Sequence, residues 1–394
     1  MTEEKSSKLN YNILIIFGVT LMAVLGVASI TPVFPQMMRE LGIDTRQIGL
    51  LITYFTLPGA ILAPFLGIMA DRFGRKRILA PSLFVFAAAG TACAFTRDFN
   101  ILLILRILQG LGAASLASVN FTIIGDLYTG AQRVRVMGLN ASVLSVGTAL
   151  YPLIGGALGL LGWHYPFILP VIAVPIGILV LTVLKNPEPR SSESIKEYLV
   201  NTWKCLRNSN VFTYFGAGLL TFIILYGTIL TYFTILLGEK FDASPFLIGL
   251  IISAMSLTTA LVSSQLARIN KRFSFSTTIK AGFAMYALAV VLIPFMPSLW
   301  LLLIPVVIFG MAHGANFPSV QTAITELAPL EYRAAFMSLS TTMLRLGQAI
   351  GPPIMALVYI HMGLEATFYI GAGLALLVPV LGTIFGRRNN APSI

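Results

Sequence analysis

Charged residues are scarce in this sequence. They make up 10% of its 394 residues, whereas soluble domains carry about 25%. The hydrophobic share is 57%, which is more apolar surface than the core of a soluble domain can bury. This balance excludes an ordinary soluble protein and predicts a chain whose solvent is lipid. Cysteine is scarce as well: only Cys93 and Cys205 are present. Cys93 lies in an apolar run that we expect to span the membrane and Cys205 in a polar loop outside it, so we expect no disulfide.

Long apolar runs fill most of the sequence. A membrane-spanning helix needs about 20 predominantly apolar residues, and runs of this length recur from one end of the chain to the other. The sequence therefore predicts an all-α membrane protein. We expect twelve transmembrane helices, near residues 12–38, 47–70, 78–96, 100–127, 135–161, 165–184, 211–237, 245–268, 275–296, 299–326, 333–360 and 365–385.

Basic residues are distributed unevenly between the two sides of these predicted helices. The net charge is +11, and 20 of the 26 Lys and Arg residues fall on the side that also holds both termini. Cytoplasmic loops carry this excess, so we expect a multi-pass protein of the cell (inner) membrane with both termini in the cytoplasm. Because the basic charge sets topology, nucleic acid is not an expected partner.

The predicted helices fall into two halves of similar sequence. The longest polar break, 185–210, follows the sixth span, and we expect a cytoplasmic linker there with a short amphipathic helix. When the chain is shifted by 200 residues, 124–154 overlies 324–354 with ten of 31 positions identical. The sequence thus predicts an N-terminal six-helix half, 1–184, and a C-terminal six-helix half, 211–394. Tandem halves of this kind hold a substrate between them and rock around it.

Three segments of the first half carry motifs. They read GIMADRFGRKR at 67–77, LLILRILQGLGAA at 102–114 and GTALYPLIGG at 147–156. The first matches, at every defined position, the signature that the major facilitator superfamily carries between spans two and three. The second matches the span-four signature, and the third partly matches the span-five signature of antiporters, with Tyr151 in place of its second glycine. Over essentially its whole length the chain resembles this superfamily, most of all its twelve-span drug:proton antiporter branch.

The resemblance implies a conformational switch at the cytoplasmic side. In similar transporters the aspartate at the position of Asp71 points at the N-terminus of span eleven, where the helix dipole attracts a carboxylate. Arg75 would then pair with Asp126, and protonating either acid would weaken the closure. Gly67 would let helix ends approach closely, and Gly74 would form a tight turn. The alternative is a basic loop that only sets topology. The expected members of the switch are Gly67, Asp71, Arg72, Gly74, Arg75 and Asp126.

Arg106 lies inside predicted span four. A charge at that depth costs at least about 2.5 kcal/mol, so it should face protein or water and have partners. Two roles stay open for it. It is either part of a proton relay through its neighbours or a structural clamp on carbonyl groups of span one, aided by Gln109. The residues of this cluster are Arg106, Gln109 and Gly110.

Acidic residues are absent from the middle of every predicted span. Exporters of cationic drugs commonly use a carboxylate in their cavity, so its absence favours an anionic or neutral substrate. The ionisable groups inside the spans are Arg106, Arg345 and His313, and histidine titrates near neutral pH. In the fold that the resemblance implies, spans one, four, seven and ten line the cavity. The candidate substrate-binding residues are Asn120, Tyr226, Tyr232, His313, Asn316 and Arg345.

Prolines inside predicted spans five and eleven indicate helix bends, at Pro152 and at Gly351 with Pro352. The sequence shows no metal-ligand cluster, nucleophile triad or phosphate-binding loop, so we expect neither an enzyme nor a metal or cofactor. We predict a monomeric secondary transporter in the lipid bilayer that exports small amphipathic compounds in exchange for protons. Two alternatives stay open. One is a transporter of an organic anion or metabolite, such as a sugar acid or siderophore-like compound, and the other is a lipid-moving or ligand-sensing protein of the same fold.

Overall fold

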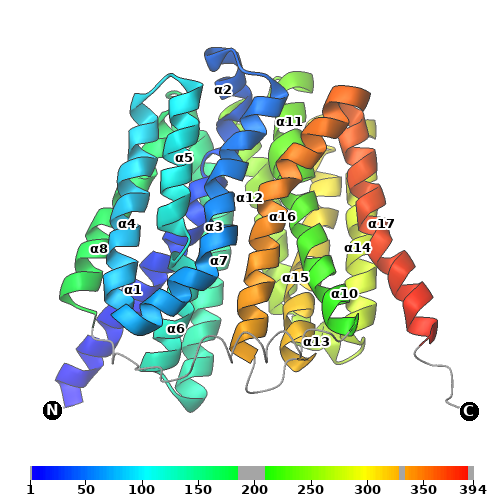
Figure 1. The fold of residues 1–394 in the computed structure, drawn as a ribbon. Helices are drawn as coiled ribbons and strands as arrows, with labels where there is room; N and C mark the ends of the chain where they lie inside the picture. Colours follow the sequence, from blue (N-terminus) through cyan, green and yellow to red (C-terminus); the bar gives the residue numbers. More distant parts are fainter. Residues whose placement is uncertain (1, 185–208, 328–332, 389–394) are drawn as a thin grey trace, which may run out of the picture. The chain divides into compact units, whose positions relative to one another are not determined.

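The computed structural model describes residues 2–184, 209–327 and 333–388 (Figure 1). Every regular element in these ranges is a helix. Eleven of the helices are long and apolar enough to cross a membrane, and the shorter apolar helix Leu364–Val380 supplies a twelfth segment. The expected all-α membrane protein is confirmed. The expected linker at 185–210 lies almost wholly outside the described residues.

The chain divides into two compact units, of which the first comprises Met1–Ser194 together with Ser244–Leu250. Two of its spans are interrupted: a 3₁₀ turn separates α1 from α2, and two non-helical residues separate α5 from α6. Its helices are α1 (Thr2–Ala28), α2 (Phe34–Leu41), α3 (Thr45–Phe73), α4 (Arg75–Ala92), α5 (Phe99–Ala113), α6 (Leu116–Leu127), α7 (Gly130–Gly159) and α8 (Ala173–Thr182).

The second unit comprises Ile195–Ala243 and Ile251–Ile394. Helix α12 begins in the first unit and continues in the second. The other helices from residue 209 onwards belong wholly to the second unit. Together with α12, they are, in chain order, α10 (Ser209–Ile223), η4 (Ile224–Phe233), α11 (Thr234–Lys240), α12 (Pro245–Ser264), α13 (Leu266–Asn270), α14 (Phe275–Leu292), α15 (Leu303–Leu327), α16 (Arg333–Met362) and α17 (Leu364–Arg388).

Span seven departs from α-helical geometry in its middle. The ten residues Ile224–Phe233 form a π-helix, a form that mostly occurs as a single turn and often at functional sites. Inside it, the Thr231 hydroxyl donates to the carbonyl of Tyr226, five residues earlier, at 2.8 Å. A Cβ added at Gly227 would meet the carbonyl oxygen of Gly351 at 2.7 Å. The π-helix therefore packs backbone to backbone on α16.

The prolines of spans five and eleven lie inside continuous helices. Pro152 is within the 30 residues of α7, and Pro352 and Pro353 are within the 30 residues of α16. The expected bends stay predictions. The structure gives Gly351 a packing role, because a Cβ there would meet the carbonyl oxygen of Ile223 at 2.8 Å. Without a side chain at this position, α16 can lie directly against span seven.

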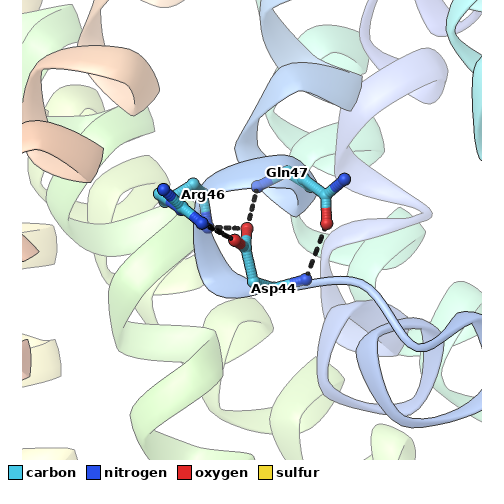
Figure 2. Close-up of polar contacts among 3 residues, drawn as sticks. All are labelled: Asp44, Arg46 and Gln47. Atoms are coloured by element: carbon cyan, nitrogen blue, oxygen red, sulfur yellow. Dashed lines mark hydrogen bonds and ion pairs between the residues drawn. The ribbon is translucent and has the colours of Figure 1, made fainter. Parts of the chain in front are cut away.

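A capping box fixes the start of α3 (Figure 2). The Asp44 carboxylate accepts hydrogen bonds from the backbone N–H groups of Arg46 and Gln47, both at 2.9 Å. The backbone N–H of Asp44 donates in return to the Gln47 side chain at 2.9 Å, and the Arg46 side chain donates to the carboxylate at 2.7 Å. Burial acts to raise the pKa of Asp44, but these hydrogen bonds and the charge of Arg46 outweigh it and hold the pKa below its usual value.

Replacing Asp44 with Ala should destabilise the protein by about 1 kcal/mol, the usual cost of losing an N-cap side chain. Because the folded-state pKa of Asp44 is lowered, its contribution is present above the unfolded-state pKa of about 3.9. It is lost as the pH falls through the folded-state value. Thermal unfolding in detergent measures the effect. The unfolding temperature of the variant should lie below that of the wild type at neutral pH, and this difference should shrink at acidic pH.

Thr129→Ala is the matched control, since Thr129 precedes α7 and, within the described part of the chain, its side chain makes no capping hydrogen bond. This variant should unfold close to the wild-type temperature at every pH. An equal loss of stability in the Thr129 and Asp44 variants would show that the capping hydrogen bonds do not stabilise α3.

Candidate functional site

A single residue, Gly74, joins α3 to α4. Helix α3 ends at Phe73, α4 begins at Arg75, and Gly74 between them has a φ of 98°. Residues with a Cβ rarely adopt this conformation, so the expected tight turn is confirmed. Gly67 differs, because a Cβ there would meet no atom of the described chain within 4 Å. The expected close approach of helix ends at Gly67 therefore stays a prediction.

Arg75 and Asp126 form an ion pair between the start of α4 and the end of α6. Nε of Arg75 lies 2.5 Å from Oδ2 of Asp126, and the side chains are 6% and 21% exposed. Salt screens such a partly buried pair less than an exposed one. The expected pairing is confirmed, and its role in a switch stays a prediction. Arg72 is exposed, and Asp71 is described only as backbone of α3, so its contact with span eleven also stays a prediction.

Arg106 is completely buried on α5. Its Nε donates to the carbonyl oxygen of Leu51 at 3.0 Å, and its Nη1 donates to Oε1 of Gln109 at 2.6 Å. The guanidinium also lies over the ring of Phe55, 4.2 Å from its centroid. These contacts give the charge the partners that it needs in lipid, and they are those of a clamp. No contact among the described residues links Arg106 to a carboxylate.

The expectation that Arg106 holds span one is wrong, because Leu51 and Phe55 belong to α3, which is span two. The reason lies one turn along α5. A Cβ at Gly110 would meet the carbonyl oxygen of Phe55 at 2.2 Å. The missing side chain lets α5 lie directly on α3, and Arg106 on the same face then reaches the carbonyl of that helix.

Asn120 belongs to a buried hydrogen-bond network that joins three helices of the first unit. Its Nδ2 donates to the carbonyl of Ile16 at 3.0 Å and to Oγ1 of Thr20 at 2.7 Å. The Thr20 hydroxyl donates to Oδ1 of Asn140 at 2.6 Å. Asn120 is only 2% exposed. The network thus ties α6 to α1 and α7, and a substrate role for Asn120 stays a prediction that this burial does not favour.

The second unit gathers polar and aromatic side chains around His313 on α15. Nδ1 of His313 lies 2.7 Å from the hydroxyl of Tyr286 on α14. The His313 ring stacks on Phe317, with centroids 5.7 Å apart and planes at 3°. One turn along α15, Nδ2 of Asn316 donates to Oγ1 of Thr221 on α10 at 3.0 Å. The structure therefore brings together two of the expected residues, His313 and Asn316, and adds Tyr286.

Sequence reasoning missed Tyr286, although the sequence contains a signal for it. A tyrosine in the middle of an apolar span must find a partner for its hydroxyl when it is buried, and Tyr286 is 0% exposed. The sequence does not say which group that partner is, because His313 lies 27 residues further along the chain. Only the packing of α14 on α15 brings the two together.

Tyr226 and Arg345 form a second, half-buried group in the same unit. The Tyr226 ring stacks on Phe222, with centroids 5.8 Å apart, and Arg345 on α16 is close enough to interact electrostatically with Tyr226. Tyr232 packs differently: it is 0% exposed, with its ring 5.7 Å from that of Tyr359. Burial does not favour a substrate role for Tyr232. Within the described residues, no carboxylate pairs with Arg345, and no cluster of His, Cys, Asp and Glu could hold a metal ion.

Comparisons with known proteins agree with this architecture. A family model described as Major Facilitator Superfamily matches residues 16–237 and again residues 218–393. The bacillibactin exporter of Bacillus subtilis (strain 168) is 26% identical over 360 residues, which covers 88% of this chain and 89% of that protein. The quinolone resistance protein NorA of Staphylococcus aureus (strain Mu50 / ATCC 700699) is 25% identical over 375 residues and 93% of each chain. Among solved structures, the nucleoside transporter NupG (D323A mutant) superposes with a TM-score of 0.80 at 15% identity, over 94% of this chain and 99% of that one.

Replacing Arg106 with Ala should lower the thermal unfolding temperature in detergent and abolish any transport. The variant loses two hydrogen bonds to a charged group, each worth about 1.5–3 kcal/mol, together with the contact to the Phe55 ring. Arg106→Lys should also fail, because an ammonium cannot reproduce the forked geometry that reaches both Leu51 and Gln109.

The matched control is Arg39→Ala, since Arg39 is exposed at the end of α2. This variant should keep its unfolding temperature and its activity. A near-normal unfolding temperature in Arg106→Ala, together with lost proton coupling, would reject the clamp and restore the relay.

Proposed function

The chain belongs to the Major Facilitator Superfamily, and we propose that it is a proton-coupled exporter of small amphipathic compounds. The observation that carries the proposal is that two relatives covering 88% and 93% of the chain are named for export and for drug resistance. These names favour export over the lipid-moving and ligand-sensing alternatives. The proposed protein is a monomer with both termini in the cytoplasm, and it works by alternating access without a cofactor.

The second unit supports an anionic or neutral substrate. Arg345 is half-buried, and no carboxylate of the described residues pairs with it. A charge inside a membrane span requires a partner, and a substrate anion can be that partner. The half-buried ring of Tyr226, stacked on the buried ring of Phe222, offers aromatic surface beside it. An aromatic surface next to a fixed positive charge attracts planar acids and repels cations, which supports the organic-anion alternative as the second candidate.

The direct test is flux into proteoliposomes of the full chain, with the membrane potential clamped. An exporter that exchanges substrate for protons should accumulate substrate when the lumen is acidic, because protons leave as substrate enters. A protonophore should abolish this accumulation. The panel compares anionic, neutral and cationic compounds of similar size, and we expect the cations to be transported least. Accumulation that does not depend on the pH gradient would overturn proton coupling. Preferred transport of bulky cations would overturn the proposal of an anionic or neutral substrate.

Arg345→Gln should weaken binding of anionic compounds and spare neutral ones. Losing one charge-assisted hydrogen bond costs about 1.5–3 kcal/mol, which corresponds to about ten- to a hundred-fold in affinity. Arg345→Lys keeps the charge and should retain part of the affinity. Equilibrium binding of a matched anionic and neutral pair measures the effect.

The control for this experiment is Arg39→Gln, which removes an exposed arginine and should leave both affinities unchanged. Equal weakening of the anionic and the neutral compound by Arg345→Gln would mean that Arg345 binds backbone carbonyls or Gln348 and has a structural role.

A further inference from the structure

The hydroxyl of Tyr286 has a defined partner in this unit, the imidazole of His313. The two atoms are 2.7 Å apart, and Tyr286 is held in place by the rings of Phe283 and Phe309, whose centroids lie 5.6 and 4.6 Å away. Asn316 also lies beside the Tyr286 hydroxyl. The tyrosine thus lies between the titratable ring of His313 and the amide of Asn316, which donates a hydrogen bond to Thr221 on α10.

The two protonation states of His313 require opposite roles of this hydroxyl. When neutral His313 carries its hydrogen on Nε2, Nδ1 accepts the hydrogen of the Tyr286 O–H. When the ring takes up a proton at Nδ1, both nitrogens become donors, and the Tyr286 oxygen must accept. The hydroxyl hydrogen then needs another acceptor. Among the described residues, Oδ1 of Asn316 is buried and has no hydrogen-bond partner, so the same cluster contains that acceptor.

We propose that Tyr286 is the positioning residue of a proton site at His313 and transmits its protonation, through Asn316, to the α10 hydrogen bond at Thr221. One proton is taken up from the aqueous side and ends on Nδ1. The Tyr286 O–H turns from His313 towards Oδ1 of Asn316, and no covalent bond of the protein breaks. Because Nδ2 of the same amide bonds Thr221, turning the amide towards Tyr286 weakens the link between α15 and α10.

This inference rests on the proposed proton-coupled export and names the group that carries the coupling. Thr221 immediately precedes Phe222 and lies about one helical turn before Tyr226, the two rings that stack on each other. Protonation on α15 therefore acts on the part of span seven that carries this aromatic pair, of which Tyr226 is half-buried. Coupling of this kind needs no carboxylate inside a span.

Among the described residues, the titratable group that faces His313 is Tyr286 on α14. From α10 the imidazole meets the ring of Phe222, and on α15 it lies beside the rings of Phe309 and Phe317. Within the described residues, no carboxylate faces the imidazole. A protonated His313 is thus stabilised by its hydrogen bond to Tyr286.

The test uses nuclear magnetic resonance of the full chain in lipid nanodiscs with isotope-labelled histidine. The chain has only three histidines, His164, His313 and His361, and His313→Gln assigns the resonance of interest. In the wild type we expect neutral His313 as a single tautomer that carries its hydrogen on Nε2. In Tyr286→Phe the two tautomers should mix. The titration midpoint should also move to lower pH by about one unit, because a hydrogen bond to the charged ring is worth more than one to the neutral ring.

His164 and His361 serve as internal references, and their resonances should not change. Tyr369→Phe is the matched control, since Tyr369 is exposed at 41% on α17. In proteoliposomes, Tyr286→Phe should shift the pH midpoint of transport in the same direction, whereas Asn316→Leu should remove the pH dependence and keep the His313 tautomer.

Three results separate this inference from the proposed function. An unchanged tautomer and midpoint in Tyr286→Phe would overturn the inference, whatever the transport assay shows. A changed midpoint with an unaltered pH profile of transport would also overturn it, because His313 would then titrate without driving the cycle. Wild-type transport that ignores the pH gradient would instead overturn the proposed proton coupling, and the histidine spectra would still report the Tyr286 hydrogen bond.

Discussion

Lipid offers no hydrogen-bond partners, so a polar group inside a membrane span is stabilised when it finds a partner within the protein. The polar interactions of this structure follow from that constraint. Arg106 reaches a neighbouring helix's carbonyl and Gln109, Asn120 reaches Thr20, and Tyr286 reaches His313. Each of these bonds crosses between helices, apart from the one to Gln109. These few polar side chains therefore hold together helices that close packing has already brought into contact.

The charged and titratable side chains named above are buried to different degrees in the two units. In the first unit, Arg106 is completely buried, and the side chain of Arg75 is 6% exposed in its ion pair with Asp126. In the second unit, His313 and Arg345 are only half-buried. A group that must exchange a proton or meet a ligand cannot be sealed. This difference agrees with a structural role for Arg106 and with the chemical roles proposed for His313 and Arg345.

The sequence predicted the features that local chemistry determines, and it failed where packing decides. Apolar runs give the spans, and a glycine between two helices gives the turn at Gly74. The partner helix of Arg106 was wrong because the contact at Gly110 that selects α3 depends on three-dimensional packing. The π-helix carries no signature in its residue types, and Tyr286 looked like part of an apolar run. In both cases the decisive contact comes from a residue far along the chain.

The π-helix joins the packing of span seven to the proposed chemistry. A π-segment has poorer hydrogen bonding than an α-helix and persists only where its surroundings hold it. Here the contact of Gly227 with the backbone of Gly351 and the bond from Thr231 to the Tyr226 carbonyl supply that support. Tyr226 is therefore fixed by α16, the helix that also carries Arg345. Because Thr221 begins the turn that leads into this segment, a change in its bond to α15 acts on a stretch already held on α16. A small movement of Thr221 then changes either the distance between Phe222 and Tyr226 or the backbone hydrogen bonds of the π-segment between them.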